Sequence, residues 1–342
     1  MPKHLPSVFV CFVAAMMWVG PNLLPGQSET WQSSLTSHHA IATVNVNVQR
    51  ASESFEGTDA LEHISEFFEL RRGLDIEDVD QFQAIIVRDP KLELGADDTT
   101  HTHVTFKEGR KFDAESVGKL SGYRLTESKL GNWKAYLGDE RRRGAWGAIQ
   151  TSDRSLVFGV SRMLNSIVAS QETELPEAHK LDKLRKQDVD ICITISGGEP
   201  IAAVFAESWA TDQYSSTFEL LDRGLIYVDV QSETPLVAEF QATSDEAAKQ
   251  LEIEISKLIR LAHSGIDAFA PQMDRQLESL KKLEGENLGR MTVELQAMRD
   301  SLDVCRQTLD SLEITVDGKQ IKIVSKEREN LKSLIQTLVE MF

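Results

Sequence analysis

The hydrophobic pattern of the chain becomes regular at Ala42. Val44, Val46 and Val48 alternate with asparagine and glutamine, a period of two that is typical of a strand with one side facing solvent. The preceding residues 29–41 are polar and rich in Ser, Gln and His, which predicts a loose leader.

From this strand to residue 170, apolar runs and turn residues predict a fixed order of elements. The strand is followed by a helix, two strands, a second helix, a hairpin and a last helix. The expected positions are helix 59–71, strands 84–87 and 103–106, helix 112–120 behind an Asp113 cap, strands 146–150 and 156–160, and a helix to about residue 168.

The same order recurs in residues 176–342, after a polar linker at 170–176 that ends in proline. The expected positions are strand 189–195, helix 200–209, strands 225–230 and 236–240, a helix from the Thr243–Glu246 capping box to about 261, strands 312–316 and 321–324 around Asp317-Gly318, and a helix to about 338. Gly265 is interpreted as the stop signal of the helix that begins at the capping box. We therefore expect an α+β fold of two related halves, 42–170 and 176–342, with antiparallel strands backed by helices.

The second of these halves carries one long helical insertion, 272–311. From Leu288 to Leu312 its apolar positions are spaced alternately by three and four residues, a heptad seam that includes Leu295 and Leu302. One interpretation is a helix laid on the protein's own sheet. The other is a seam that binds a partner or forms a homodimer, with Leu288, Leu295 and Leu302 as its candidate contacts.

The first residues have the features of a secretory signal peptide. Lys3 precedes an apolar run at 8–19, which is shorter than the roughly 20 residues that cross a bilayer. Small residues favour cleavage after Ser28 or after Gly26. We expect residues 1–28 to be removed, leaving a periplasmic or secreted protein without a transmembrane span. A buried N-terminal helix and an uncleaved anchor are the alternatives.

The net negative charge of the chain argues against one class of partner, nucleic acid. Asp and Glu number 54 against 37 Lys and Arg, a formal charge of −17 over 342 residues. Such a chain repels phosphate backbones, so nucleic acid is not expected as a partner. Two cysteines lie beyond the predicted cleavage site, Cys192 in an apolar strand and Cys305 on an apolar helix face. We expect buried free thiols, with a single disulfide as the alternative.

His101 and His103 are the best candidates for metal ligands, because positions i and i+2 of a strand face the same way. The surrounding residues are polar and typical of a loop, so surface histidines beside an exposed strand are the simpler interpretation. We expect no metal and no cofactor. A metal-assisted hydrolase that uses this pair is the remaining enzymatic hypothesis.

Three other patterns are interpreted as structural. Ser196-Gly197-Gly198 lacks the spacing of a phosphate-binding loop and predicts a tight turn. The acidic run 75–80 lacks the Gly and Glu of a calcium loop, so we expect it to cap a helix and face solvent. Neither Gly-x-Ser-x-Gly nor His-Glu-x-x-His occurs in the chain, so no catalytic residue is assigned.

Arg141, Arg142 and Arg143 form a basic group in an otherwise acidic chain. A solvated hairpin tip is the simpler interpretation. The alternative is a contact for an acidic partner or for anionic lipid.

Several short sequences resemble a broad group of exported bacterial proteins that are common in planctomycete-type genomes. They are TVNVNVQ at 43–49, GLDIEDVD at 73–80, VDICITISGGEPI at 189–201 and LEITVDGK at 312–319. The resemblance implies an extracytoplasmic α+β repeat protein and assigns no functional residues. We expect a non-enzymatic envelope protein that acts as an interaction or structural module with an envelope protein as partner. Small-molecule or lipid binding is the alternative function.

Overall fold

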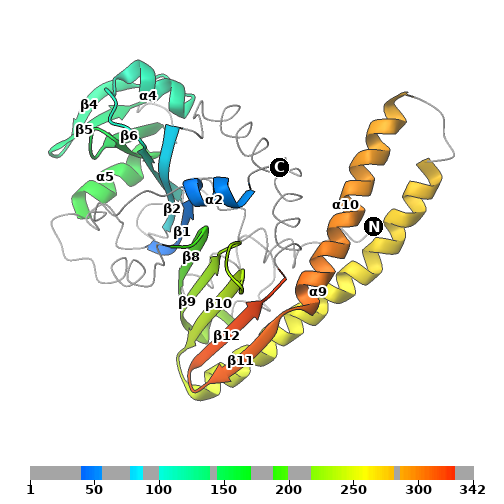
Figure 1. Cartoon of the computed structure of the whole chain (residues 1–342). Coiled ribbons are helices and arrows are strands. Elements are labelled where there is room, and N and C mark those ends of the chain that lie inside the picture. Colours follow the sequence, from blue (N-terminus) through cyan, green and yellow to red (C-terminus); the bar gives the residue numbers. More distant parts are fainter. Residues whose placement is uncertain are drawn as a thin grey trace.

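The computed structural model describes residues 40–55, 78–87, 100–138, 145–170, 188–198, 217–280 and 286–327. Twelve strands of these residues form one antiparallel sheet (Figure 1). The strands are β1 (Ala40–Asn47), β2 (Val79–Val87), β3 (Thr100–Phe106), β4 (Thr126–Leu130), β5 (Trp133–Leu137), β6 (Trp146–Gln150), β7 (Ser155–Val160), β8 (Ile191–Ser196), β9 (Leu221–Val228), β10 (Leu236–Ala242), β11 (Glu313–Asp317) and β12 (Gln320–Ser325). The helices are α2 (Val48–Phe55), α4 (Ala114–Ser121), α5 (Ser161–Ser170), α9 (Asp245–Leu280) and α10 (Glu286–Asp310).

The strand order is β11-β12-β10-β9-β8-β1-β2-β3-β7-β6-β5-β4. The predicted α+β class with antiparallel strands is therefore confirmed. β1 and β8 pair in the middle of the sheet, with Val44 opposite Ile193. At this junction the hydroxyl groups of Thr43 and Thr194 lie 2.6 Å apart and share a hydrogen bond.

The two faces of the sheet are covered by different helices, because successive side chains of a strand point to opposite faces. On one face, Phe82 and Ile193 belong to a large apolar core that α2, α4 and the first part of α9 cover. On the other face, Ile85 and Val157 pack with Leu164 of α5 in a smaller core. Burial of these two cores is the main stabilising contribution to the sheet.

Helix α4 begins as the sequence predicts. The Asp113 side chain accepts a hydrogen bond from the Ser116 backbone N–H at 2.8 Å, and the Ser116 hydroxyl oxygen accepts one from the Asp113 N–H. These bonds satisfy donors that the first turn of a helix leaves without partners. The helix ends at Gly122, whose φ of 71° is a left-handed conformation that glycine adopts readily.

Helix α9 differs from the prediction at both ends. Its N-terminal cap is Ser244, whose hydroxyl oxygen accepts a hydrogen bond from the Ala247 N–H at 3.0 Å, rather than Thr243. The predicted stop at Gly265 is wrong, since the helix continues to Leu280. The apolar stripe explains the extension, because buried side chains recur at helical spacing beyond the glycine, from Ile266 to Leu277.

Several predicted elements lie outside the described residues. They are the signal peptide 1–28, the leader 29–39, the helices at 59–71 and 200–209, the linker at 171–176 and the helix beyond residue 328. Val48, which the sequence pattern assigned to a strand, is the first residue of α2. Within the described ranges no helix is both long and apolar enough to cross a membrane.

Candidate functional site

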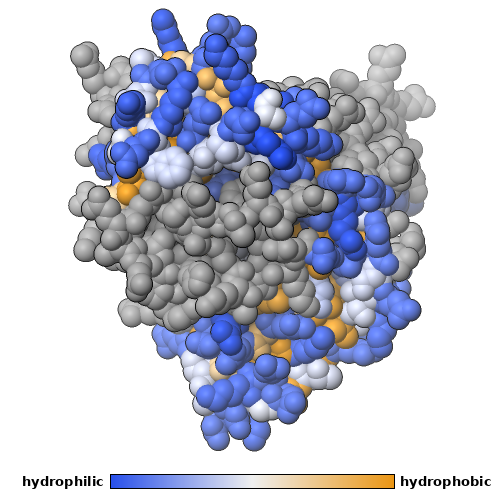
Figure 2. All heavy atoms as spheres, turned by 60° about the vertical axis from the view of Figure 1, so that its left-hand side comes forward, coloured by the Kyte–Doolittle hydropathy of each residue, from blue (hydrophilic) through white to orange (hydrophobic). Residues whose placement is uncertain are grey.

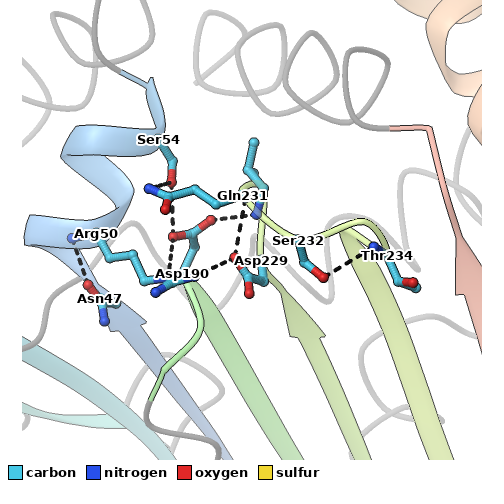
Figure 3. Close-up of polar contacts among 9 residues, drawn as sticks. Asn47, Arg50, Ser54, Asp190, Asp229, Gln231, Ser232 and Thr234 are labelled. Carbon is cyan, nitrogen blue, oxygen red and sulfur yellow. Dashed lines mark hydrogen bonds and ion pairs between the residues drawn. The ribbon is translucent and has the colours of Figure 1, made fainter.

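A cluster of polar side chains lies where β1 meets α2, at the entry to β8 and in the loop after β9 (Figure 3). Asp190 directly precedes β8 and is fully buried, whereas Asp229 directly follows β9. Arg50 reaches both carboxylates from the first turn of α2. The cluster therefore joins α2 to parts of the chain that are about 140 to 180 residues away in sequence.

Asp190 accepts two hydrogen bonds in the cluster and faces Arg50. Its Oδ2 accepts the Val230 backbone N–H at 2.7 Å, and its Oδ1 accepts the Ser54 hydroxyl at 3.1 Å. Arg50 Nε lies 3.4 Å from the same Oδ1. Burial raises the pKa of Asp190, although the bonds from Val230 and Ser54 act in the opposite direction.

Arg50 holds the other carboxylate of the cluster. Its Nη2 lies 2.7 Å from Asp229 Oδ1, and this hydrogen bond is the main reason that the pKa of Arg50 is raised. The backbone N–H of Arg50 donates to Asn47 Oδ1 at 2.6 Å, which caps the start of α2. The backbone N–H of Gln231 donates to Asp229 Oδ1 at 3.2 Å and so orders the loop after β9.

The chemistry of this cluster is that of a structural connection. The Ser54 hydroxyl donates a hydrogen bond to the Asp190 carboxylate, and in these contacts no histidine stands beside it to act as a base. Structural networks of paired and hydrogen-bonded groups also shift pKa values, so the raised pKa of Asp190 does not by itself indicate catalysis. We interpret the cluster as a set of polar contacts that connects β1 and α2 to β8 and β9.

His101 and His103 lie side by side on β3, with ring centroids 5.4 Å apart. The interpretation as surface histidines is wrong, since their exposed fractions are 0% and 4%. β3 is an inner strand between β2 and β7, and its position in the sheet buries residues whose sequence neighbours are polar. Burial lowers the pKa of both imidazoles, that of His103 to about 3, so both are neutral at pH 7.

The described part of the chain contains no group of three or more His, Cys, Asp or Glu side chains placed to hold a metal ion. His101 and His103 therefore have no third ligand of these types among those residues. The hydrolase hypothesis gains no further residue from the structure.

Ser196-Gly197-Gly198 forms the tight turn that the sequence predicts. The Gly197 N–H donates to the Asp222 carbonyl at 2.8 Å, and the Gly198 N–H donates to the Phe218 carbonyl at 3.1 Å. Gly198 has a φ of 88°, which favours glycine. Both N–H groups are used within the protein, so the turn does not present them to an anion.

The end of the acidic run pairs with arginines instead of facing solvent alone. Asp78 Oδ2 lies 2.9 Å from Arg110 Nη2, and Asp80 Oδ2 lies 2.9 Å from Arg154 Nη2. These contacts connect β2 to residues that follow β3 and precede β7. They account for Asp78 and Asp80 without a calcium ion.

The predicted heptad seam lies on α10, which packs against the second part of α9 as a helical hairpin (Figure 1). Leu302, Cys305 and Leu309 contact Ala262 and Ile266. The seam thus covers α9, a packing that neither sequence-based interpretation anticipated. Ion pairs flank it, between Arg299 and Asp274 and between Arg306 and Asp267, and His263 Nε2 lies 3.6 Å from Asp310 Oδ1.

The other predicted partner contacts are placed as follows. Leu295 and Leu302 are half-buried on α10. The side chain of Leu288 and the whole of Arg141, Arg142 and Arg143 lie outside the described residues.

The polar cluster was not predicted from the sequence, although one signal for it was present. Asp190 stands directly before the apolar run Ile-Cys-Ile-Thr-Ile, and a charged residue at the edge of such a run needs a partner when it is buried. The identity of its partners, Arg50 and Ser54, depends on which strands become neighbours.

Comparisons with known proteins give no match. No protein-family model matches the chain, and neither the curated proteins nor the solved structures contain a match.

Cys192 and Cys305 are buried and are not joined in a disulfide, as expected from the sequence. Burial raises the pKa of Cys305 to about 12, so its thiolate is scarce at pH 8.

In a Cys11→Ser variant, we expect a thiol reagent at pH 8 to leave native Cys192 and Cys305 unmodified and to modify both after unfolding. The measurement is intact mass with iodoacetamide. Ala268→Cys, at an exposed position of α9, is the control that should react quickly, and rapid native labelling of Cys305 would contradict its burial.

Proposed function

We propose that this chain is an exported, non-enzymatic protein of the cell envelope that acts as an interaction or structural module. The contact surface is the α9–α10 arm, defined as residues 260–280 of α9 together with α10. The observation that carries the proposal is the change of partner along α9. Its first part packs on the sheet through Leu251 and Ile255, and its second part packs on α10 through Ala262 and Ile266.

The arm is long enough to present a separate surface. About twenty residues of helix span about 30 Å, and Figure 1 shows that the far end of the hairpin lies away from the sheet. Two helices that pack mainly on each other leave their outer faces available for a partner. The ion pairs across the hairpin help to fix the two helices in register.

One exposed apolar side chain marks the arm. Among the described residues the large apolar side chains that are exposed are Tyr123, Ile253 and Phe269. Hydrophilic residues predominate on the described surface in the view of Figure 2, with small apolar groups between them. Phe269 lies on the arm and is 38% exposed, and exposed aromatic residues are frequent contacts in protein interfaces.

The strand order supports a duplicated architecture as part of this proposal. On one side of the central junction the order is β1-β2-β3-β7-β6 and continues with β5 and β4, which have no counterpart among the described strands on the other side, where the order is β8-β9-β10-β12-β11. In both series the first three strands along the chain are neighbours in the sheet. Next to the third lies the last strand of that half, and beyond it lies the strand that precedes the last one in the chain. The antiparallel pairing of β1 with β8 is compatible with an approximate twofold axis near Thr43 and Thr194. In this proposal the arm is an insertion into the second copy.

Export is proposed from the N-terminal sequence. The apolar run at 8–19 followed by small residues is typical of a signal peptide, and the resemblance to exported planctomycete-type proteins supports the same proposal. The lack of common catalytic motifs in the sequence favours a binding or structural role.

A pair of charge substitutions on one helix tests the arm. We expect Phe269→Glu to reduce recovery of a stoichiometric partner from the native envelope fraction at least about tenfold, because a buried charge in an interface costs more than about 1.4 kcal/mol. Ile253→Glu is the matched control, since Ile253 is 47% exposed on the part of α9 that packs on the sheet. The measurement is affinity purification of tagged full-length chain with partner identification and intact mass by mass spectrometry.

The possible results separate the parts of the proposal. Equal recovery with both variants would place the partner elsewhere, and Arg142→Ala would then be the next variant. A processed mass with no protein partner would favour the small-molecule or lipid binder. An unprocessed mass in the cytosolic fraction would contradict export.

A further inference from the structure

His101 lies where helix α5 is seated on the sheet. On β2 its neighbour is Ile85, which belongs to the same small apolar core as Leu164 of α5. On β7 its neighbour is Gly159. A Cβ added to Gly159 would lie 3.3 Å from the Cβ of His101 and 3.5 Å from Cδ2 of Leu164. The histidine and the leucine therefore flank the same space above the glycine.

The ring of His101 is fully buried, and neither of its nitrogens has a hydrogen-bond partner among the described residues. A buried neutral imidazole tolerates this at a moderate cost. A buried imidazolium does not, because it needs a counter-charge or water.

Among the residues that the structure describes, the elements around His101 supply no counter-charge at this place. The only charged residue of α5 is Arg162, which is exposed, and β7 has none. The charged residue of β2 is Asp80, which pairs with Arg154 at the opposite end of the strand from Ile85. The titratable neighbour of His101 is His103, and a second imidazole disfavours protonation further.

We propose that His101, with His103 beside it, makes the packing of α5 on the sheet sensitive to acid. Gain of a proton releases α5 from β6 and β7, on which it packs, and exposes the small apolar core beneath it, which includes Ile85 of β2. The opposite face, which α2, α4 and α9 cover, stays packed. This inference is independent of the arm and its partner.

The direction follows from the pKa values of the closed and open states. When α5 is released, water reaches His101 and its pKa returns to an ordinary value near 6.5. In the closed state burial lowers that pKa well below this value, and that of His103 to about 3. Above pH 6.5 the two histidines are neutral in both the closed and the open state, so the packing of α5 keeps its full stability there. Stability is lost as the pH falls from 6.5, by about 30-fold in the opening equilibrium for each histidine at pH 5.

Hydrogen exchange of the full-length protein tests the proposal. After correction for intrinsic rates, we expect amides of α5 to lose about a thousandfold of protection between pH 7.5 and pH 5, since the two histidines act together. Amides of Ala247 to Ile255 in α9 should change by less than about tenfold. In His101→Leu the loss for α5 should shrink to about 30-fold, because only His103 still titrates.

The matched control is His263→Gln, which alters a partly exposed histidine of α9 beside Asp310. Its α5 response should equal that of the wild type. If His101→Leu does not fold, an NMR titration of the wild-type imidazoles still decides, with His101 expected to remain neutral down to pH 5. Titration of His101 between pH 6 and 7, unchanged α5 protection at pH 5, or a full response in His101→Leu would each overturn the proposal.

Discussion

Replacement of Asp190 by alanine is expected to lower the free energy of unfolding by about 3 kcal/mol. The change removes the acceptor for the Val230 N–H and for the Ser54 hydroxyl, and it removes one of the two carboxylates beside Arg50. Buried donors that lose their acceptor cost about 1 to 3 kcal/mol each. The measurement is denaturant unfolding at pH 7.5 followed by circular dichroism.

Two control variants test whether the loss of stability comes from the buried carboxylate. Asp190→Asn keeps one carbonyl oxygen for the Val230 N–H, so we expect it to lose about half as much stability. Asp222→Ala removes an aspartate that is 55% exposed and 4.0 Å from Arg223, which should change stability by less than about 0.5 kcal/mol. A loss in Asp190→Ala no larger than that in Asp222→Ala would show that the cluster does not hold β8 to α2.

Gly197→Ala is expected to destabilise the protein by about 3 kcal/mol or more, and a failure to fold would agree with this. A Cβ at position 197 would lie 1.7 Å from the carbonyl oxygen of Leu221. This obstacle is backbone, so β8 and the start of β9 would have to separate. That movement would break the hydrogen bond from the Gly197 N–H to the Asp222 carbonyl, which is 2.8 Å long.

Gly122→Ala provides the comparison for this steric effect. Gly122 has a φ of 71° and open space around its Cα, with nothing within 4 Å of an added Cβ. Alanine there should cost about 1 kcal/mol, the strain of a left-handed conformation alone. Thermal and denaturant unfolding of both variants should therefore differ clearly. Equal losses would show that backbone conformation, and not the contact with Leu221, decides the effect at Gly197.

The elements that the sequence predicts well are those with a strong local pattern. β6 was expected at 146–150 and is found there, and the Asp113 cap of α4 was read from its residues. The β4–β5 hairpin was missed because β4 is an exposed edge strand with almost no apolar residues. The Gly131-Asn132 pair between the two strands is a recognised hairpin signal that could have revealed it.

The site depends on contacts that no local pattern contains. Arg50 and Asp229 are 179 residues apart and meet because β1 is a neighbour of β8 and β8 a neighbour of β9. The burial of His101 likewise follows from the inner position of β3 and not from its polar neighbours in sequence. Strand order is set by the packing of the whole chain, and for this reason the heptad seam on α10 could not be assigned to α9 in advance.

The central pairing of the sheet has a consequence for the order of folding. β1 forms near the start of the chain, but its partner β8 follows about 150 residues later, as the Thr43–Thr194 contact shows. During synthesis, the edge of β1 that pairs with β8 therefore stays unpaired until residues 191–195 emerge. Closure of so long a loop is slow, and an open strand edge invites association with other chains. The interval before β8 arrives is thus the period in which the nascent chain most needs a chaperone.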